Sequence, residues 1–593
     1  MPSIIINGVK TEFKPGQTIL QVANDLVARG EVGEQAEIPQ YCYHDGLSVV
    51  ASCRICLAEC YAPNPKSGAI EPFMGGKLVP TCQTPAVDGM VVHTDSPKAV
   101  ANQKAVMEFL LINHPLDCPV CDQSGECFLQ DYSYQFGRGV SRFEEQKVKQ
   151  PKKDLGPNVL LYSDRCIMCT RCVRFTREVT GTSELMVQGR GNKEEIDVFP
   201  GVALDNELSG NVVDLCPVGA LLDKDFLFAQ RVWFLKETAS IDGITASGDN
   251  IWVHHNEGKV HRIKPRTNEK VNKWWITDEV RHGWSFVHSQ DRLTSAMRRH
   301  HGRLVETDFA KGYADVIEGI AAATGRGKRL AVMVSPMLSC EEAFLLARLA
   351  RRLDPKAILA VGPVPVLGQD RYYPKGIGAE DPKAFRVSAE KCPNARGVRR
   401  VLSGFGGASH VASYESLLTM LEEPGGSIGA VILTGNYPSE WGTTELKKAL
   451  AGEFVVLVDT LASSVMELAS VVLPGATWVE KSGTFENVGG LLQAFEQAIP
   501  VVELAKSEGQ IALDLEAVLD GVLPPSERAM PVPVISTKAQ VPAGARVALA
   551  WREVYDSARV RGEMVASGLG EFGGVSTPSS RAARRSGMEL VEI

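Results

Sequence analysis

Residues 166–172 read CIMCTRC, and a further cysteine, Cys216, stands immediately before Pro217. Within the triplet, two residues separate each cysteine from the next. A C-x2-C-x2-C run with a distant C-P cysteine is typical of thiolates that hold an iron-sulfur cubane. No second triplet lies near Cys216, so one cluster has to receive all four sulfurs. The predicted 4Fe-4S ligands are therefore Cys166, Cys169, Cys172 and Cys216.

Three arginines accompany this motif, namely Arg165, Arg171 and Arg174. Positive charge beside a cluster stabilises its reduced state, which is the more negative one. The alternative is that these side chains are solvated at the surface and do not act on the cluster. The sequence leaves both readings open.

An earlier group of cysteines lies in residues 41–56, YCYHDGLSVVASCRIC, with a fourth in VPTCQTP at 79–85. Three thiolates on one loop and a fourth from elsewhere suit a binuclear cluster, because the loop must curl round two irons. Small residues in the loop, Gly46, Ala51 and Ser52, would let backbone amides approach the sulfurs. A zinc site is the alternative, although zinc sites usually pair two C-x-x-C units. The predicted 2Fe-2S ligands are Cys42, Cys53, Cys56 and Cys82, with Cys60 as a buried bystander.

A third group has the spacing H-x3-C-x2-C-x5-C, in the polar stretch that ends in DCPVCDQSGEC at 117–127. An imidazole can replace one thiolate of a cubane, and the loss of one negative charge should raise the potential. A zinc site with three thiolates and one imidazole also fits the ligand types. His114 could instead interact only with the end of a helix dipole, and Asp117 would then be a substitute ligand. The predicted second set of 4Fe-4S ligands is His114, Cys118, Cys121 and Cys127.

Composition limits the other functions that the chain could have. The chain has 593 residues, room for several domains, and 14 cysteines with a formal net charge of −8. Thiols grouped in short spacings indicate metal rather than disulfides, which are rare in a reducing cytosol. The negative charge argues against nucleic acid as a partner. No apolar run is long enough to cross a bilayer and none resembles a secretory signal, so we expect a cytosolic protein, although a removed organellar presequence would be invisible.

Periodicity predicts the local structure around these groups. Ile4 and Ile6 alternate before an Asn7-Gly8 turn, which predicts a hairpin, and Thr18 should cap a helix that stops at Gly30. Another helix should open at Ser96-Pro97, with an apolar stripe of Val106, Phe109 and Leu110. A basic connector is expected at about 146–158. Beyond about residue 300, apolar strands alternate with helical stretches, which predicts a parallel α/β sheet.

Three cluster motifs in this order resemble the large iron-sulfur subunit, the 75-kDa type, of respiratory complex I, NADH:quinone oxidoreductase. The resemblance implies one 2Fe-2S and two 4Fe-4S clusters on the ligands given above, and an electron relay without a catalytic centre of its own. Expected partners are a flavin-bearing, NADH-oxidising subunit and other peripheral-arm subunits, with the membrane arm contacted indirectly. The implied location is the cytoplasmic side of the inner membrane, as a peripheral subunit.

By the same resemblance the chain is an α/β multidomain protein that ends in a degenerate molybdopterin-oxidoreductase-like region. The segment SIDGITASGDNIWV at 240–253 carries no cysteine where some relatives hold a further cubane, and we see no molybdenum ligand. No molybdenum, flavin or NAD is therefore expected in this chain. The implied domains are a β-grasp 2Fe-2S ferredoxin-type domain (1–97), a His-ligated 4Fe-4S domain (98–137), a ferredoxin-like 4Fe-4S domain (138–236), a degenerate 4Fe-4S-type domain without cysteines (237–293), the α/β domain (294–520), and a Pro-rich strap with a flexible tail (521–593).

Three other functions remain as alternatives. A subunit of an NAD-linked hydrogenase would share the first 220 or so residues and lack the α/β part. A molybdenum formate dehydrogenase would need an active-site cysteine or selenocysteine, and outside the groups and Cys60 only Cys340 and Cys392 are left. A zinc-stapled structural protein is disfavoured by the ligand spacing.

Overall fold

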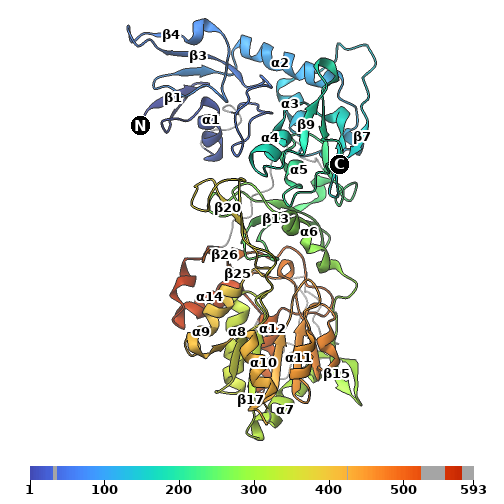
Figure 1. The fold of residues 1–593 in the computed structure, drawn as a ribbon. Coiled ribbons are helices and arrows are strands. Elements are labelled where there is room, and N and C mark those ends of the chain that lie inside the picture. The colour runs from blue at the N-terminus through green and yellow to red at the C-terminus, as the bar shows by residue number, and fades with distance from the viewer. Residues whose placement is uncertain (31–36, 424, 522–553, 577–593) are drawn as a thin grey trace, which may run out of the picture. The chain divides into compact units, whose positions relative to one another are not determined.

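A computed structural model describes residues 1–30, 37–423, 425–521 and 554–576. The chain forms two compact units, which are drawn in Figure 1. The first contains Met1–Leu235 together with Tyr373–Lys383, and the second begins at Lys236 and contains the remaining described residues. Every predicted cluster ligand falls in the first unit.

The N-terminal hairpin forms as predicted. Strand β1 (Ser3–Ile6) pairs antiparallel with β2 (Val9–Glu12), and the turn between them holds Asn7 and Gly8 at φ of 46° and 83°. The sheet runs in the order β2-β1-β6-β3-β4, with a sixth strand, β5, paired to β3. Its other strands are β3 (Leu57–Pro63), β4 (Ile70–Pro72), β5 (Val79–Pro80) and β6 (Val91–His93).

Helix α1 (Ile19–Ala28) packs its apolar face against this sheet. It begins with a capping box, in which the Thr18 side chain accepts from the Gln21 amide and the Gln21 side chain accepts from the Thr18 amide. Gly30 follows the helix at φ 67°, in the left-handed region that commonly ends helices. A mixed sheet with one packed helix is the expected β-grasp arrangement.

Helix α2 (Pro97–Ile112) begins at the predicted Ser96 cap, but the predicted apolar stripe is wrong. The buried residues are Ala99, Gln103 and Met107, whereas Phe109 is 74% exposed. The buried face is selected by specific bonds, because Gln103 donates to the Thr94 carbonyl at 3.0 Å and the Met107 sulfur accepts from the Tyr41 hydroxyl at 3.3 Å. A polar side chain with a partner can replace an apolar one on a buried face.

The rest of the first unit consists of short elements joined by loops. The expected connector at 146–158 contributes a strand, β7, to a three-stranded sheet in the order β11-β8-β7. Residues 373–383 also pack here, since the Lys375 amide donates to the Val179 carbonyl at 2.8 Å and the Tyr373 hydroxyl donates to Glu207 at 2.6 Å. The elements are α3 (Phe128–Phe136), β7 (Lys152–Asp154), β8 (Val159–Tyr162), α4 (Arg171–Glu178), β9 (Leu185–Gln188), β10 (Glu195–Val198), α5 (Asn211–Leu215) and β11 (Leu221–Asp223).

The second unit opens with an antiparallel three-stranded sheet. The strands β12 (Lys236–Ile241), β13 (Asn250–Asn256) and β14 (Lys259–Pro265) are followed by the short helix α6 (Asp278–His282). Ile251, Val253 and Ile263 are almost fully buried in the core of this part. The smaller strands of the unit are β25 (Gly483–Glu486) and β26 (Leu492–Phe495), while β19 (Arg371–Tyr373) and β20 (Phe385–Val387) bracket the segment 373–383 in the sequence.

The main sheet of the second unit has eight strands in the order β16-β15-β24-β23-β22-β17-β18-β21. All neighbours from β24 to β21 pair in parallel, which confirms the predicted α/β region. The strands are β15 (Ala296–His300), β16 (Arg303–Thr307), β17 (Arg329–Val334), β18 (Ile358–Val361), β21 (Val411–Ala412), β22 (Ile428–Thr434), β23 (Phe454–Asp459) and β24 (Val471–Pro474).

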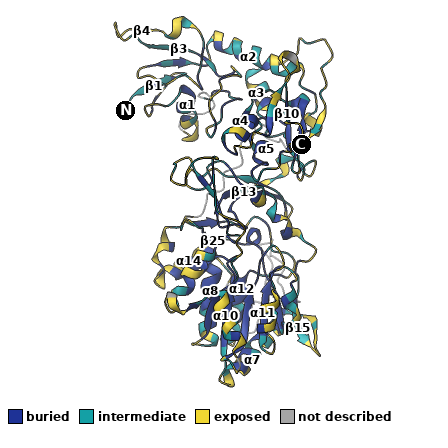
Figure 2. Ribbon diagram, in the orientation of Figure 1, coloured by how far each residue is buried: buried dark blue, intermediate teal, exposed yellow. Residues whose placement is uncertain are grey.

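Helices cover both faces of this sheet, so the central strands are apolar throughout. Leu330 and Val332 of β17 face one core cluster, and Ala331 and Met333 face the other. Figure 2 shows the sheet and helix α8 as mostly buried. The helices are α7 (Phe309–Gly325), α8 (Cys340–Leu353), α9 (Ala395–Ser403) and α12 (Glu508–Leu519) on the first face, and α10 (Tyr414–Glu422) and α11 (Thr444–Ala449) on the second.

The predicted Pro-rich strap and tail at 521–593 need a correction. Most of this segment, including the Pro-rich part, lies outside the described residues. Residues 554–576, however, include helix α14 (Ser557–Ala566), which packs into the α/β core through Val560 and Met564. Its Arg561 donates to Glu341 of α8 at 2.8 Å, a pair in which both side chains are buried. The helix has a weak apolar pattern, and tertiary packing rather than periodicity accounts for it.

Candidate metal centres

The first cysteine group surrounds the loop that enters β3. Cys42, Cys56 and Cys82 are buried and Cys53 is partly buried. The thiols of Cys53 and Cys82 hold the pKa of Cys42 well below its usual range, and the Cys82 thiol lowers the pKa of Cys56 to about 7. Cys42 thus interacts with Cys53 and Cys82, and Cys82 interacts with Cys56, while a cluster shared by the four stays a prediction. Cys60 lies on β3, where burial raises its pKa to about 12, and none of the four thiols contributes to that shift.

Backbone amides are directed at the sulfurs of this group. The amides of Cys53 and Ser52 both act on the Cys42 sulfur, and the amide of Ile55 acts on that of Cys53. Ala51 and Arg54 adopt φ of 51° and 59°, a left-handed conformation that side chains seldom take. Backbone strain of this kind occurs where a site has to be held in one shape. Hydrogen bonds to the sulfurs are one of the means by which a protein sets a cluster's potential.

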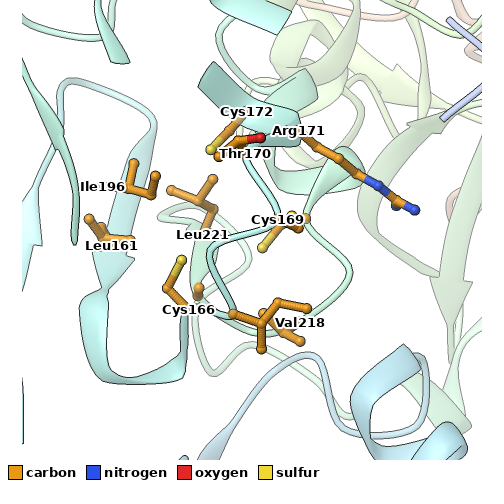
Figure 3. A pocket seen from close by; sticks show the side chains of 12 residues that line it. Leu161, Cys166, Cys169, Thr170, Arg171, Cys172, Ile196, Val218 and Leu221 are labelled. Atoms are coloured by element: carbon orange, nitrogen blue, oxygen red, sulfur yellow. The ribbon is translucent and has the colours of Figure 1, made fainter. Parts of the chain in front are cut away.

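The C-x2-C-x2-C triplet and Cys216 line one pocket (Figure 3), whose other walls are mainly apolar side chains of Leu161, Ile196, Val218 and Leu221. Burial raises the pKa of Cys166 to about 12 and that of Cys169 to about 11. Metal coordination relieves this cost, because a bound thiol is deprotonated.

The turn that carries the triplet is strained in the same way as the first loop. Met168 and Thr170 both adopt positive φ, of 53° and 59°. The Met168 amide consequently donates to the Cys166 sulfur at 3.4 Å. On the other side, the amides of Val218, Ala220 and Leu221 act on the Cys216 sulfur.

The group between α2 and α3 contributes the three thiols of Cys118, Cys121 and Cys127. Cys127 caps the start of α3, and burial, with Cys121 and Cys118 nearby, raises its pKa to about 12. Cys118 is exposed, in contrast to the other two. The charges of these thiols act on one another, and their role as cluster ligands stays a prediction.

His114 follows the end of α2, beside a cation and its partner. Burial first, and then the charges of Arg165 and Lys147, lower the pKa of His114 to about 4, so its imidazole is neutral and can act as a ligand near pH 7. Arg165 forms a 2.9 Å ion pair with Asp117, the residue considered as a substitute ligand. Asp117 is thus paired with a cation, and His114 as the fourth ligand stays a prediction.

Two observations from these residues fit iron-sulfur clusters. A Cβ atom at Gly219 would lie 2.2 Å from the Cys121 sulfur. There is therefore no room for a side chain at this position, where the loop of Cys216 passes the His114 group. Arg171 and Arg174 each leave the buried Nε atom without a hydrogen-bond partner, as expected of cations beside an anionic group. Among the described residues, no group of three or more His, Cys, Asp or Glu side chains is placed to hold a single metal ion.

For the three arginines of the triplet, the sequence left open whether they lie beside the cluster or in solvent. Arg165, Arg171 and Arg174 are only 2%, 5% and 6% exposed, so the reading of solvated surface arginines is wrong. Their position within a cysteine motif was the available signal, but their partners are distant in the sequence: Arg171 and Arg174 bond to the loop of residues 42–48, and Arg165 bonds to Asp117 and Gly219. The other two ungrouped cysteines, Cys340 and Cys392, are buried in the second unit.

Comparison with protein families gives matches along most of the chain. The matching descriptions are a 2Fe-2S iron-sulfur cluster binding domain (residues 2–97), the NADH-ubiquinone oxidoreductase-G iron-sulfur binding region (103–142), the ferredoxin-like domain of NADH-quinone oxidoreductase subunit 3 (156–222), the NADH-ubiquinone oxidoreductase NDSU1/NuoG-like 4Fe-4S domain (235–285) and molybdopterin oxidoreductase (401–518). The 4Fe-4S domain match at 235–285 contains no cysteine in this chain.

Curated relatives give the same result. The G subunit of NADH-quinone oxidoreductase from Rickettsia felis is 37% identical over 353 residues, 60% of this chain and 49% of the relative. The NADH-ubiquinone oxidoreductase 75 kDa subunit of Reclinomonas americana is 37% identical over 62% of this chain and 50% of its own length. The mitochondrial NADH dehydrogenase [ubiquinone] iron-sulfur protein 1 of Solanum tuberosum is 41% identical over 53% of this chain and 40% of its own length. The matched region thus spans about half the length of these relatives.

Solved structures resemble the chain only distantly. An NAD+-reducing [NiFe]-hydrogenase in the H2-reduced state aligns with a TM-score of 0.31 at 26% identity, over 39% of this chain and 91% of the other. Acetylene hydratase from Pelobacter acetylenicus aligns with a TM-score of 0.34 at 12% identity, over 48% and 69%. No described helix has both the length and the apolar character needed to cross a membrane.

Proposed function

We propose that this chain, a homologue of the 75 kDa iron-sulfur subunit of NADH-quinone oxidoreductase, carries electrons through three iron-sulfur clusters from an NADH-oxidising flavin partner toward quinone. The observation that supports this best is the gathering of three cysteine groups in one compact unit, with backbone amides directed at their sulfurs. Clusters transfer single electrons, so the chain's own residues need only hold, tune and shield them.

The proposed ligands are those that the spacings predict. A 2Fe-2S cluster is assigned to the first group, and 4Fe-4S clusters are assigned to the His114 group and to the Cys166 group. We assign no cluster to residues 237–293 and no molybdenum to the α/β region. The domain limits at 97, 137, 236, 293 and 520 are proposed on the same basis.

The surroundings of Cys118 suit a place where electrons leave the chain. Leu116 and Val120 flank this exposed thiol and are 86% and 56% exposed. Phe228, 61% exposed, lies close by because its amide donates to Asp122 at 3.0 Å. Exposed apolar side chains around a redox centre favour a protein partner over water. We therefore propose a partner subunit here, within a complex at the cytoplasmic side of the inner membrane.

Metal content tests the assignment most directly. Protein purified anaerobically should contain about ten irons per chain, from one binuclear and two cubane clusters. Stoichiometric zinc with little iron would refute the relay, and bound molybdopterin would favour a complete enzyme instead.

A matched pair of cysteine variants tests the ligands within the assembled complex. Cys169→Ala should remove one cubane signal from the electron paramagnetic resonance (EPR) spectrum and stop electron flow from NADH to quinone. Cys60→Ala, at a thiol outside all three groups, should retain full iron and full flow. Unchanged flow in Cys169→Ala would show that this cluster is off the electron path.

A further inference from the structure

Helix α4 carries two buried cations, Arg171 and Arg174, between two of the cysteine groups. The first guanidinium donates to the carbonyl of Tyr43, next to Cys42, and to that of Leu215, next to Cys216, at 3.4 Å. The second donates to the carbonyl of Cys42 and to that of Cys169 at 3.3 Å. Each arginine therefore bridges the 2Fe-2S loop and the Cys166 group.

These cations have no carboxylate partner in the described part of the chain. Their bonds go to backbone carbonyls, and Arg174 adds one to Ser48, whereas Arg165 is paired with Asp117. The nearest acidic group on the helix, Glu178, is engaged by the Ser48 amide at 2.8 Å. A buried cation is costly unless an anion compensates it. Two thiolate-ligated clusters, one on either side, would supply that negative charge.

We infer that Arg171 and Arg174 form a shared counter-ion between the 2Fe-2S cluster and the cubane on Cys166, Cys169, Cys172 and Cys216. Arg171 is among the residues that line the cubane pocket, and its side chain runs from there away from the cysteines (Figure 3); both guanidiniums bond to backbone carbonyls of the loop that carries Cys42. Each cluster becomes more negative when it accepts an electron, so a fixed cation between them stabilises the reduced state of both. The two arginines therefore favour reduction of both clusters, whereas the cation beside the His114 group is Arg165.

The test is a redox titration, followed by EPR, of the complete iron-loaded protein carrying Arg171→Gln or Arg174→Gln. Removal of either charge should shift the oxidised-to-reduced equilibrium of both clusters at least tenfold toward the oxidised form, about 59 mV for a one-electron couple. The signal of the His114 cluster should keep its midpoint. Arg177→Gln, an exposed arginine on the same helix, is the matched control and should leave all three midpoints unchanged.

A shift confined to one cluster, or no shift in an iron-replete variant, would overturn the shared counter-ion. Should the glutamine variants lose iron, Arg171→Lys and Arg174→Lys decide, because lysine keeps the charge but not the forked bonds. If the lysine variants retain both clusters near the original midpoints, the positive charge is what matters. If the lysine variants also lose iron, the role of charge is refuted. The inference rests on the proposed ligands, but iron-free wild-type protein would defeat that assignment, whereas unshifted midpoints would defeat this inference alone.

Discussion

Gly219→Ala should disrupt one cluster without touching any ligand. The added Cβ would lie 2.2 Å from the Cys121 sulfur, more than an ångström short of the 3.4 Å at which ordinary contact begins, and 3.1 Å from the Gln123 Cβ. Backbone strain is not involved, because Gly219 does not have a positive φ. The clash must therefore move one of two loops, that of Cys121 or that of Cys216.

The loop of Cys121 should yield. The Cys216 loop is held by three amides on its sulfur and by the Tyr162 amide, which donates to the Ala220 carbonyl at 2.7 Å. Overpacking of this kind costs about 1–3 kcal/mol, which is a loss of roughly 5- to 150-fold in cluster affinity. We expect the EPR signal of the His114 cluster to weaken or vanish, while the other two clusters remain.

Iron analysis and EPR of the reduced protein measure this outcome. Gly139→Ala is the control, since a Cβ there meets nothing within 4 Å and the residue has no positive φ. A Gly219→Ala protein with its full complement of iron and an unaltered His114 cluster would refute the reasoning. Selective loss of the Cys166 cluster would show that the other loop gives way.

Two further predictions concern the second unit. Lys481 lies 2.9 Å from Glu342 and 2.7 Å from Glu508, and all three side chains are buried. Lys481→Met should lower the free energy of unfolding by about 3–5 kcal/mol, because a buried acidic pair loses its cation. Calorimetry of the full chain should show a lowered Tm, whereas Lys448→Met, in an exposed pair, should change it little, and equal Tm values would contradict the prediction. Burial raises the pKa of Asp459 to about 6 from 3.8, so the folded state binds a proton more tightly than the unfolded state. This group therefore stabilises the fold below about pH 4, and about 3 kcal/mol of that stability is lost as the pH rises to about 6. Over this pH range the free energy of unfolding of the wild type should fall by that amount relative to Asp459→Asn. An equal pH dependence in the two proteins would refute the prediction.

The sequence allowed the cluster groups to be predicted because their information is local. Ligand spacing and turn residues act over a few positions, so the groups can be recognised from the sequence alone. The capping box at Thr18 and the Asn7-Gly8 turn were predictable for the same reason. The alternating apolar strands after residue 300 are similarly local, since strands covered on both faces need apolar side chains throughout.

The features that were missed all depend on distant contacts. The face of α2 that is buried is chosen by Thr94 and Tyr41, not by the apolar stripe through Phe109. Burial of Arg174 requires the loop of Cys42 and Ser48, and the need for Gly219 arises from Cys121. Periodicity carries no information on such pairings, which are set only when separate segments of the chain meet.

The packing of residues 373–383 within the first unit has a consequence for biosynthesis. A ribosome finishes Leu235 long before it reaches Lys375, whose amide donates to the Val179 carbonyl just beyond helix α4. At typical elongation rates this interval lasts roughly 7–30 s, during which the nascent unit lacks one of its own segments. The unit can therefore be completed only after segment 373–383 has been synthesised, well after the last proposed cluster ligand, Cys216.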